Sequence, residues 1–275
     1  MEKGKTALTV ADFNEMGEKL ERLLLLRYSP IALKVLHEGD AIPEGTIRPK
    51  RDRGEHLAMC QAFAKVRRDR AAITMLKEDH WCVWPLISYG LVPVEEEDYE
   101  NLGSKFFVKD PKWGVEYFRN DYPRLNDTNV IGFSIAPLRS CTFVPDLVCT
   151  YCRPAQIRSF QMAAKFQSGR MLELRLDPVD SCVHSTIPVL NGQDYNITFP
   201  DPGEYERALA DEDEVMFTMR AEKLPEIVDG IEFLCRTGFG YKELSMEMAY
   251  DFPRPKFYND MFEKWGLETG KEWRK

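Results

Sequence analysis

The chain has 275 residues, of which 44% are hydrophobic and 30% charged, and its formal net charge is −8 at pH 7. This length and composition predict a globular protein with room for a sizeable core. The acidic balance argues against a nucleic-acid partner, and no apolar run reaches the roughly 18 residues of a membrane span. The first residues, MEKGKTALTVADF, lack the apolar core of a signal peptide, so we expect a cytoplasmic protein.

The first part of the chain alternates predicted helices and strands. Thr9 and Asp12 form the pattern of a capping box, and the helix that they begin is expected to run to Arg27. The elements predicted next are a strand at 29–37, a charged loop at 39–54, a helix at 55–68, a strand at 71–76 and a helix or irregular turn at 82–91. Residues 92–128 are acidic, aromatic and turn-rich, and we expect them to cover a face of the core.

The second part continues the alternation. Its predicted elements are strands at 129–138, 145–152, 170–176, 195–199 and 214–220, and helices at 154–169, 180–192 and 222–238. The tail after Phe239 has weak periodicity. Strands that alternate with helices favour an α/β fold, with α+β as the alternative, in which helices layer on a mixed, largely parallel sheet.

An internal repeat is suggested when residues 60–90 are set beside residues 160–190 without gaps. Eight of these positions are identical, where chance gives roughly two: Gln61/Gln161, Ala64/Ala164, Lys65/Lys165, Arg70/Arg170, Leu76/Leu176, Cys82/Cys182, Val83/Val183 and Ile87/Ile187. Such self-similarity constrains the fold. We therefore expect one domain over 1–275, built of two related halves at about 28–125 and 126–238, with a tail at 239–275.

Cys82 and Cys182 are the chemically informative pair in this alignment. Each is expected just after a strand, at or near the N-terminus of a helix, where partial positive charge stabilises a thiolate. If the halves pack about a pseudo-twofold axis, the two cysteines can face each other at the seam. The alternative interpretation is that each fills a small apolar space beside a helix start.

Cys60 has no counterpart in the second half, because position 160 is Phe. A cysteine that breaks the repeat is consistent with a third metal ligand, and equally with ordinary drift between two core residue types. Thiolates bind zinc at about 2.3 Å, so three ligands of one ion place their sulfurs within roughly 4 Å of one another.

Two histidines and a cysteine pair offer further candidates. His80 precedes Cys82 and His184 follows Cys182 by two residues, so either could ligate a metal or hold a proton near a thiolate, or simply bond to nearby backbone. Cys149 and Cys152 have the spacing of a zinc half-site or a redox dithiol. On a strand, however, residues three apart point to opposite faces.

The remaining signals are weaker. Cys141 and Cys235 are interpreted as structural. The basic runs at 48–53 and 65–70 are interpreted as solvated faces, with an anion-binding patch as the alternative. No phosphate loop, dinucleotide fingerprint, H-E-x-x-H motif or serine-hydrolase elbow is present in the sequence.

The sequence resembles a prokaryotic family known as domain of unknown function 169. The segments that carry the resemblance are LRYSPIALKVLHEGDAIPEGTIRP (26–49), CQAFAKVRR (60–68), the Cys of EDHWCVWP, PDLVCTYCRPAQIRSF (145–160) and DSCVHSTIPVLNG (180–192). The family pattern implies cysteines at the positions of Cys60, Cys82 and Cys182, and does not imply the pair at 149 and 152. The family is frequent in anaerobes, which suits oxygen-sensitive chemistry, and its activity is not established.

The sequence therefore predicts a three-cysteine thiolate site at Cys60, Cys82 and Cys182 with an open coordination position. A [4Fe–4S] cluster is the expected cofactor and zinc the alternative. Two other functions stay open: a metal-free accessory protein that binds a small molecule, and an enzyme in which Cys82 is a nucleophile activated by His80 or His184. We expect a small molecule or a redox partner, no nucleic acid and no membrane, and leave homo-oligomer formation open.

Overall fold

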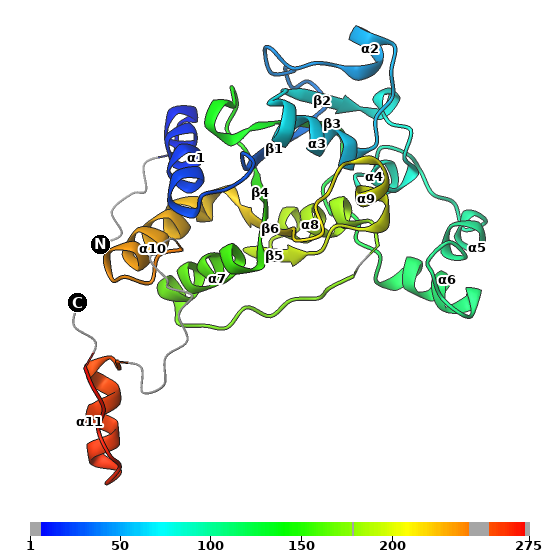
Figure 1. The fold of residues 1–275 in the computed structure, drawn as a ribbon. Coiled ribbons are helices and arrows are strands. Elements are labelled where there is room, and N and C mark those ends of the chain that lie inside the picture. Colours follow the sequence, from blue (N-terminus) through cyan, green and yellow to red (C-terminus); the bar gives the residue numbers. More distant parts are fainter. Residues whose placement is uncertain (1–6, 178, 242–252, 273–275) are drawn as a thin grey trace.

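The computed structural model describes residues 7–177, 179–241 and 253–272, and its centre is one six-stranded sheet (Figure 1). The strands follow the order β2-β3-β1-β4-β6-β5. Their bounds are β1 Ile31–His37, β2 Ile73–Leu76, β3 Val130–Pro137, β4 Leu147–Cys152, β5 Tyr195–Thr198 and β6 Val215–Arg220. Most strand residues are buried on both faces, so the sheet forms the middle layer of the molecule.

One face of the sheet is covered by three amphipathic helices, α1 Val10–Leu24, α7 Pro154–Ser168 and α10 Leu224–Arg236. Thr9 and Asp12 form the capping box that was predicted for α1. Pro154 begins α7 and Gly169, in the left-handed conformation, ends it, as the sequence predicts. These helices bury side chains such as Phe13 and Phe160 in the cluster that also contains residues of β4 and β6.

The other face carries α3 Met59–Asp69, α4 Val83–Ser88 and α8 Ser181–Leu190. The segment 92–128 contains two helices that its composition did not reveal, α5 Asp98–Gly103 and α6 Pro111–Asn120. Its aromatic residues Phe106, Phe118 and Tyr122 pack into the same core, so the expectation that this segment covers a core face is confirmed.

Short elements complete the described chain. They are α2 Pro49–Arg53, α9 Pro202–Arg207, α11 Lys256–Lys264 and the 3₁₀ turns η1 Lys77–Asp79, η2 Leu138–Ser140 and η3 Ala221–Lys223. The tail after Phe239 thus contains a helix, α11, that its periodicity did not predict. Among the described residues, no helix combines the length and apolar character needed to cross a membrane.

The expected parallel pairing is wrong, because every ladder in the sheet is antiparallel. The alternation of strands and helices normally indicates parallel crossovers. Here β1 and β2 are joined through α2 and α3, yet they are not neighbours, because β3 lies between them and pairs antiparallel with both. The fold is therefore a mixed helix-and-sheet structure on an antiparallel sheet.

The structure does not show the internal repeat. Residues 60–90 contain α3, β2, η1 and α4, whereas in residues 160–190 no strand lies between α7 and α8 among the described residues. The predicted strand at 170–176 is an extended stretch without ladder partners, whose Leu172 and Leu174 pack against the core. Its alternating pattern reflects this packing.

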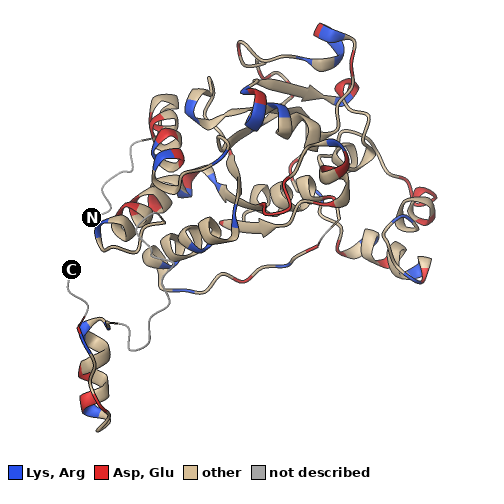
Figure 2. Cartoon of the chain, in the orientation of Figure 1, with Lys and Arg blue, Asp and Glu red and all other residues tan. Residues whose placement is uncertain are grey.

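The solvated interpretation of the basic runs is wrong for two residues. Figure 2 marks the positions of basic residues on α2 and α3 in blue. Arg48 is buried with its Nε 2.6 Å from Asp79 Oδ2. Arg67 is buried with its Nη1 2.8 Å from Glu214 Oε1. Both arginines therefore form internal ion pairs and are not part of a free anion-binding patch.

Candidate functional site

Three helix N-termini bring Cys60, Cys82 and Cys182 to one region of the protein. Cys60 is the second residue of α3, Cys82 is the N-cap of α4 and Cys182 is the second residue of α8. Cys82 packs against the small cluster that holds Cys60, and Cys60 and Cys82 both raise the pKa of the Cys182 thiol. The three thiols therefore interact, although they are up to 122 positions apart in the sequence. Figure 1 shows α4, α8 and α9 gathered beside α3.

The starts of α3 and α4 are tied together by backbone pairing. Leu57 and His80 form a parallel bridge, in which Leu57 N donates to Asp79 O at 2.9 Å and Trp81 N donates to Leu57 O at 3.3 Å. Gln61 Oε1 accepts from the Ala58 backbone N–H and from Trp81 Nε1, at 3.0 and 2.9 Å. Cys60 follows Leu57 by three residues and Cys82 follows His80 by two, so these contacts hold both cysteines in place.

The start of α8 is tied to the start of α9 by Ser181 and Asp201. Asp201 Oδ2 accepts from the Ser181 N–H at 2.9 Å, while its Oδ1 caps α9 by accepting from the Glu204 N–H at 2.9 Å. One carboxylate thus accepts hydrogen bonds from N–H groups at the starts of two helices, which have no partner within their own helix. Because Cys182 follows Ser181 directly, this cap fixes the third cysteine.

Glu204 lies beneath this junction and is completely buried. Its carboxyl contacts Ser181 Oγ at 2.7 Å and Tyr151 OH at 2.8 Å, and burial raises its pKa to about 7. The Ser181 hydroxyl has one proton but also lies 3.1 Å from Asp201 Oδ2. Both carboxylates cannot accept it at once, which is consistent with a protonated Glu204.

Asp180 is a second carboxyl with an unusual environment beside the cysteines. Its backbone is left-handed, with φ 52°, and its carbonyl begins α8 by accepting from the N–H groups of Val183 and His184. Burial raises the pKa of Asp180 to about 7, and Tyr122 OH donates to its carboxylate at 3.1 Å. The site therefore contains two carboxyl groups that titrate near neutral pH.

The thiols are not the acidic thiolates that helix N-termini suggested. Burial, followed by the charges of Glu204 and Asp201, raises the pKa of Cys60 to about 12. Burial also raises the pKa of Cys82 and, more strongly, that of Cys182. Burial outweighs the helix N-termini because a desolvated thiolate loses its hydration. Without a bound cation these cysteines are protonated at neutral pH.

Neither predicted histidine has a hydrogen bond to a thiol among the described residues. Both ring nitrogens of His80 are buried without a hydrogen-bond partner there, and its ring packs edge-on against Phe133. Burial lowers the pKa of His80 to about 4. His184 Nε2 lies 2.9 Å from Tyr117 OH. His80 and His184 therefore lack the hydrogen bond to Cys82 that a proton acceptor needs.

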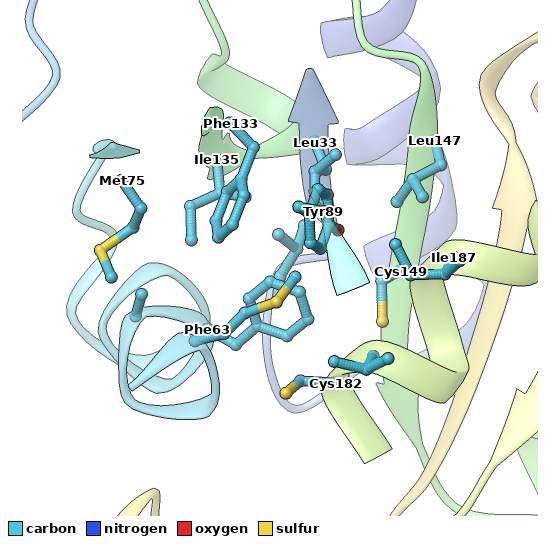
Figure 3. Packing of buried hydrophobic residues seen from close by; sticks show 14 of the residues in the cluster. Leu33, Phe63, Met75, Tyr89, Phe133, Ile135, Leu147, Cys149, Cys182 and Ile187 are labelled. Carbon is cyan, nitrogen blue, oxygen red and sulfur yellow. The ribbon is translucent and has the colours of Figure 1, made fainter. Parts of the chain in front are cut away.

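The other cysteines are core residues. Cys149 and Cys152 lie in separate hydrophobic clusters on opposite faces of β4, as strand geometry predicts. Figure 3 shows Cys149 on β4 beside Ile187, and Cys182 on the side of Phe63. Cys141 is buried and donates to Asn14 Oδ1 at 3.2 Å. All seven cysteines, Cys235 included, are outside disulfides.

A metal would need the three thiols of Cys60, Cys82 and Cys182 close together. Among residues 7–177, 179–241 and 253–272, no three His, Cys, Asp or Glu side chains are grouped closely enough to hold an ion as they stand. A single zinc ion needs three sulfurs within roughly 4 Å of one another. A [4Fe–4S] cluster binds each thiolate to a different iron and so suits a wider triangle. Three thiols at helix N-termini are donors of the type that a cluster or zinc takes.

Several residues of this region were missed from the sequence: Asp180, Ser181, Asp201, Glu204 and Arg207. The only local signal is in DPGEYER, where an Asp precedes Pro and Glu in the pattern of a helix start. That pattern predicts α9 but not its contact with α8. The convergence depends on tertiary contacts that local periodicity does not encode.

Comparison with known proteins identified one relationship. A model of the family domain of unknown function 169, described as an uncharacterised ArCR, matches residues 19–230. This span contains the three cysteines and all six strands, and it ends before α11. Searches of curated proteins and of solved structures found no match.

Proposed function

The chain belongs to this uncharacterised family, and from its own residues we propose that it is a metal- or iron–sulfur-binding protein with Cys60, Cys82 and Cys182 as ligands. The observation that supports the proposal most is the meeting of three helix N-termini, each with a cysteine in its first turn or cap. The partial positive charge of those termini favours a negatively charged thiolate–metal unit. The resemblance implies cysteines at the same three positions.

A [4Fe–4S] cluster is the proposed centre, with zinc as the alternative. Three protein thiolates leave one metal position open, and when bound the centre would supply a Lewis acid or, for iron, an electron relay. The protein's part is to place the three sulfurs, to exclude water around the buried Cys60 and Cys182, and to leave the half-buried Cys82 on the accessible side.

Binding should release protons. The raised pKa values of Cys60, Cys82 and Cys182 mean that the free thiols are protonated at neutral pH, whereas metal ligands are thiolates. Glu204 and Asp180 can be neutral at the same pH, which keeps negative charge from accumulating beside three thiolates. A reducing, cytoplasmic setting in anaerobic metabolism would suit seven cysteines that are outside disulfides.

The test is to purify the protein without oxygen, record its visible absorption, and measure iron, acid-labile sulfide and zinc. The proposal predicts a brown protein with iron and sulfide in near-equal amounts, or a colourless one with about one zinc per chain. A colourless protein with neither metal would contradict it.

A metal-free ligand-binding protein is the second candidate, because the structure contains a separate cleft of about 1110 Å³. The cleft lies at the other end of α8, near Val189, and is also lined by Val35, His37, Pro225 and Lys223. Clefts of this size commonly bind small molecules. This candidate predicts that serine at all three site cysteines leaves ligand binding unchanged.

The nucleophile candidate has less support. A cysteine nucleophile needs a depressed pKa or an adjacent base. Burial instead raises the pKa of Cys82, and the described residues provide no imidazole in hydrogen-bond contact with it. The proposal therefore gives Cys82 the role of ligand.

A further inference from the structure

The cleft of about 1110 Å³ lies at one end of the sheet. β1 ends there at His37 and β6 ends there at Arg220, because both strands run antiparallel to β4, which begins at Leu147. Residues at the end of α8 and at the start of α10, on opposite faces of the sheet, also line it. The described residues that line the cleft include none of the three site cysteines.

The most buried part of the cleft lining is apolar. Phe13, Val35 and Val189 line the cleft and are buried, and they come from α1, β1 and α8. The half-buried Leu125 and the exposed Val144 add apolar surface nearer to solvent. The cleft can therefore remove the hydrophobic part of a small molecule from water.

The charged residues of the lining differ in whether they have a partner. Each of the three basic residues has a carboxylate within ion-pair distance: His37 has Asp127 at 2.7 Å, Arg220 has Glu222 at 3.3 Å, and Lys223 has Asp194 at 3.2 Å. Asp146 and Asp229, in contrast, form no ion pair with any described residue. Lys34 and His37 act on Asp146 electrostatically, but they lie beyond ion-pair distance of it. The described lining thus has unpaired negative charge and no unpaired positive charge.

Asp146 is the more firmly held of these two carboxylates. Its N–H donates to Leu33 O at 2.8 Å and its carbonyl accepts from Ala221 N at 2.9 Å, so its backbone joins β1 to the residue that follows β6. Its Oδ2 accepts from Val35 N at 2.7 Å. The side chain is exposed, and Oδ1 has no hydrogen-bond partner in the described part of the chain. A carboxylate that is fixed in this way loses little freedom when it binds a cation.

We propose that the cleft binds an organic amine, whose ammonium group donates to Asp146 Oδ1 and whose apolar body lies against Phe13, Val35 and Val189. An amine fits an apolar lining with unpaired carboxylates, whereas an anion would compete with a carboxylate for every basic residue of the described lining. The inference gives a ligand class to the second candidate function, the ligand-binding protein, and does not depend on a metal at the cysteines.

Ligand-observed fluorine NMR on the full-length protein, purified without oxygen and studied at pH 7, tests the inference. The probe is 2-(4-fluorophenyl)ethylamine, which is protonated at this pH. Its neutral match is 2-(4-fluorophenyl)ethanol and its anionic match is 3-(4-fluorophenyl)propanoate. The amine should bind at least about tenfold more tightly than either match, because only the amine forms a charge-assisted pair with a carboxylate.

Three variants locate the ammonium group. Asp146→Asn should weaken amine binding at least about tenfold, while its amide oxygen can still accept from Val35 N–H. Val144→Lys leaves Asp146 in place and adds an ammonium group to the lining at a position that is 46% exposed, so it should also weaken amine binding. Asp229→Asn is the matched control: it removes the other unpaired carboxylate and should change the affinity by less than about threefold.

Circular dichroism and metal content of each variant complete the test. Weaker amine binding in folded Asp146→Asn and Val144→Lys, with Asp229→Asn close to wild type, supports the inference whether or not the wild type holds a metal. Cys82→Ser should bind the amine as wild type does, so failure of the metal site is distinguished from failure of this inference.

The inference is overturned if amine, alcohol and acid bind alike or none of them binds. It is equally overturned if folded Asp146→Asn keeps the wild-type affinity, or if Asp229→Asn loses as much affinity as Asp146→Asn does. If Asp146→Asn does not fold, unchanged amine binding by Val144→Lys overturns it.

Discussion

Two groups of cysteines differ in whether residues that are close in the sequence are also close in the structure. Cys60, Cys82 and Cys182 are distant in sequence, yet the starts of α3, α4 and α8 bring their thiols into interaction. Cys149 and Cys152 are three residues apart, yet β4 directs them into different cores. Spacing along the chain is therefore a poor guide to a ligand set unless the secondary structure that carries it is known.

Burial alone does not separate the two groups. It raises the pKa of Cys60 to about 12 and that of Cys149 to about 12 as well. The difference lies in the surroundings: the first group adjoins Arg207, Asp180 and Asp201, whereas Cys149 and Cys152 lie in the two large hydrophobic clusters, with the hydroxyls of Thr218 and Ser185 beside Cys149. We therefore expect changes at the two groups to affect different properties, metal content in one case and stability in the other.

The largest stability effect is expected at the ion pair that joins α3, which carries Cys60, to the strand next to Cys152. Arg67 on α3 pairs with Glu214, whose neighbour Val215 is the ladder partner of Cys152. Arg67→Met leaves the buried Glu214 carboxylate without its cationic partner, although the Asp211 N–H still donates to it at 2.9 Å, and should lower the free energy of unfolding by about 3–5 kcal/mol. Urea unfolding measures this.

The matched control is Arg51→Met, which removes the exposed pair of Arg51 with Asp52 and should cost less than about 1 kcal/mol. Equal losses of unfolding free energy in the two variants would show that the buried pair does not hold α3 to the sheet. A large loss of stability for Arg67→Met, with all seven cysteines retained, would show that this contact holds α3 to the sheet.

A pH effect is expected at the three-cysteine region. The pKa of Glu204 is raised from 4.5 to about 7, so folded protein binds this proton more tightly than unfolded protein does. The contribution of Glu204 to the stability of the metal-free protein should therefore fall by a few kcal/mol as pH rises from about 4.5 to 7. Buried His80, whose pKa is lowered to about 4, contributes in the opposite direction over this range and is the same in wild type and in the Glu204 variant. Glu204→Gln removes the contribution of Glu204 and should be more stable than wild type at pH 8 by about 1–3 kcal/mol.

Thermal unfolding between pH 4 and pH 8 tests this. Part of the slope should remain in Glu204→Gln, because the raised pKa of Asp180 acts in the same direction. A variant that is less stable than wild type at pH 8 would contradict the assignment of a neutral, buried Glu204.

A smaller effect is expected for the core pair. Cys149→Ser replaces a fully buried thiol, beside which lie the hydroxyls of Thr218 and Ser185, and should cost about 1–3 kcal/mol. Cys152→Ser should cost less, because Cys152 Sγ already has carbonyl acceptors, Val215 O at 3.5 Å and Thr150 O at 3.6 Å. Urea unfolding gives both values, and the reverse order would contradict this account of the two cores.

The sequence predicts the local features of this fold well. The capping box at Thr9, Pro154 at the start of α7, and Gly169 at its end are confirmed because each acts within a few residues. The pairing direction was wrong, because it depends on which strand lies next to β1 and not on any local pattern. The strand at 170–176 was wrong because Leu172 and Leu174 alternate to pack against the core without a neighbouring strand.

In the candidate site too, local features were predicted from the sequence and tertiary contacts were not. Cys82 and Cys182 were placed near helix starts from the sequence, and the structure puts them there, although the repeat that suggested it is not shown. Arg207 and Glu204 could not be found in this way. They reach the cysteines through the contact of α9 with α8, which Asp201 and Ser181 make across 20 residues.

The most direct test of the three-cysteine site is the metal content of five serine variants purified side by side without oxygen. Cys60→Ser, Cys82→Ser and Cys182→Ser should each fold by circular dichroism and retain less than about a tenth of the wild-type iron or zinc, because a hydroxyl is a poor ligand for either. Cys149→Ser and Cys152→Ser should retain the wild-type content. If all five fold and hold the same metal content as wild type, zero included, the three cysteines are not a metal site.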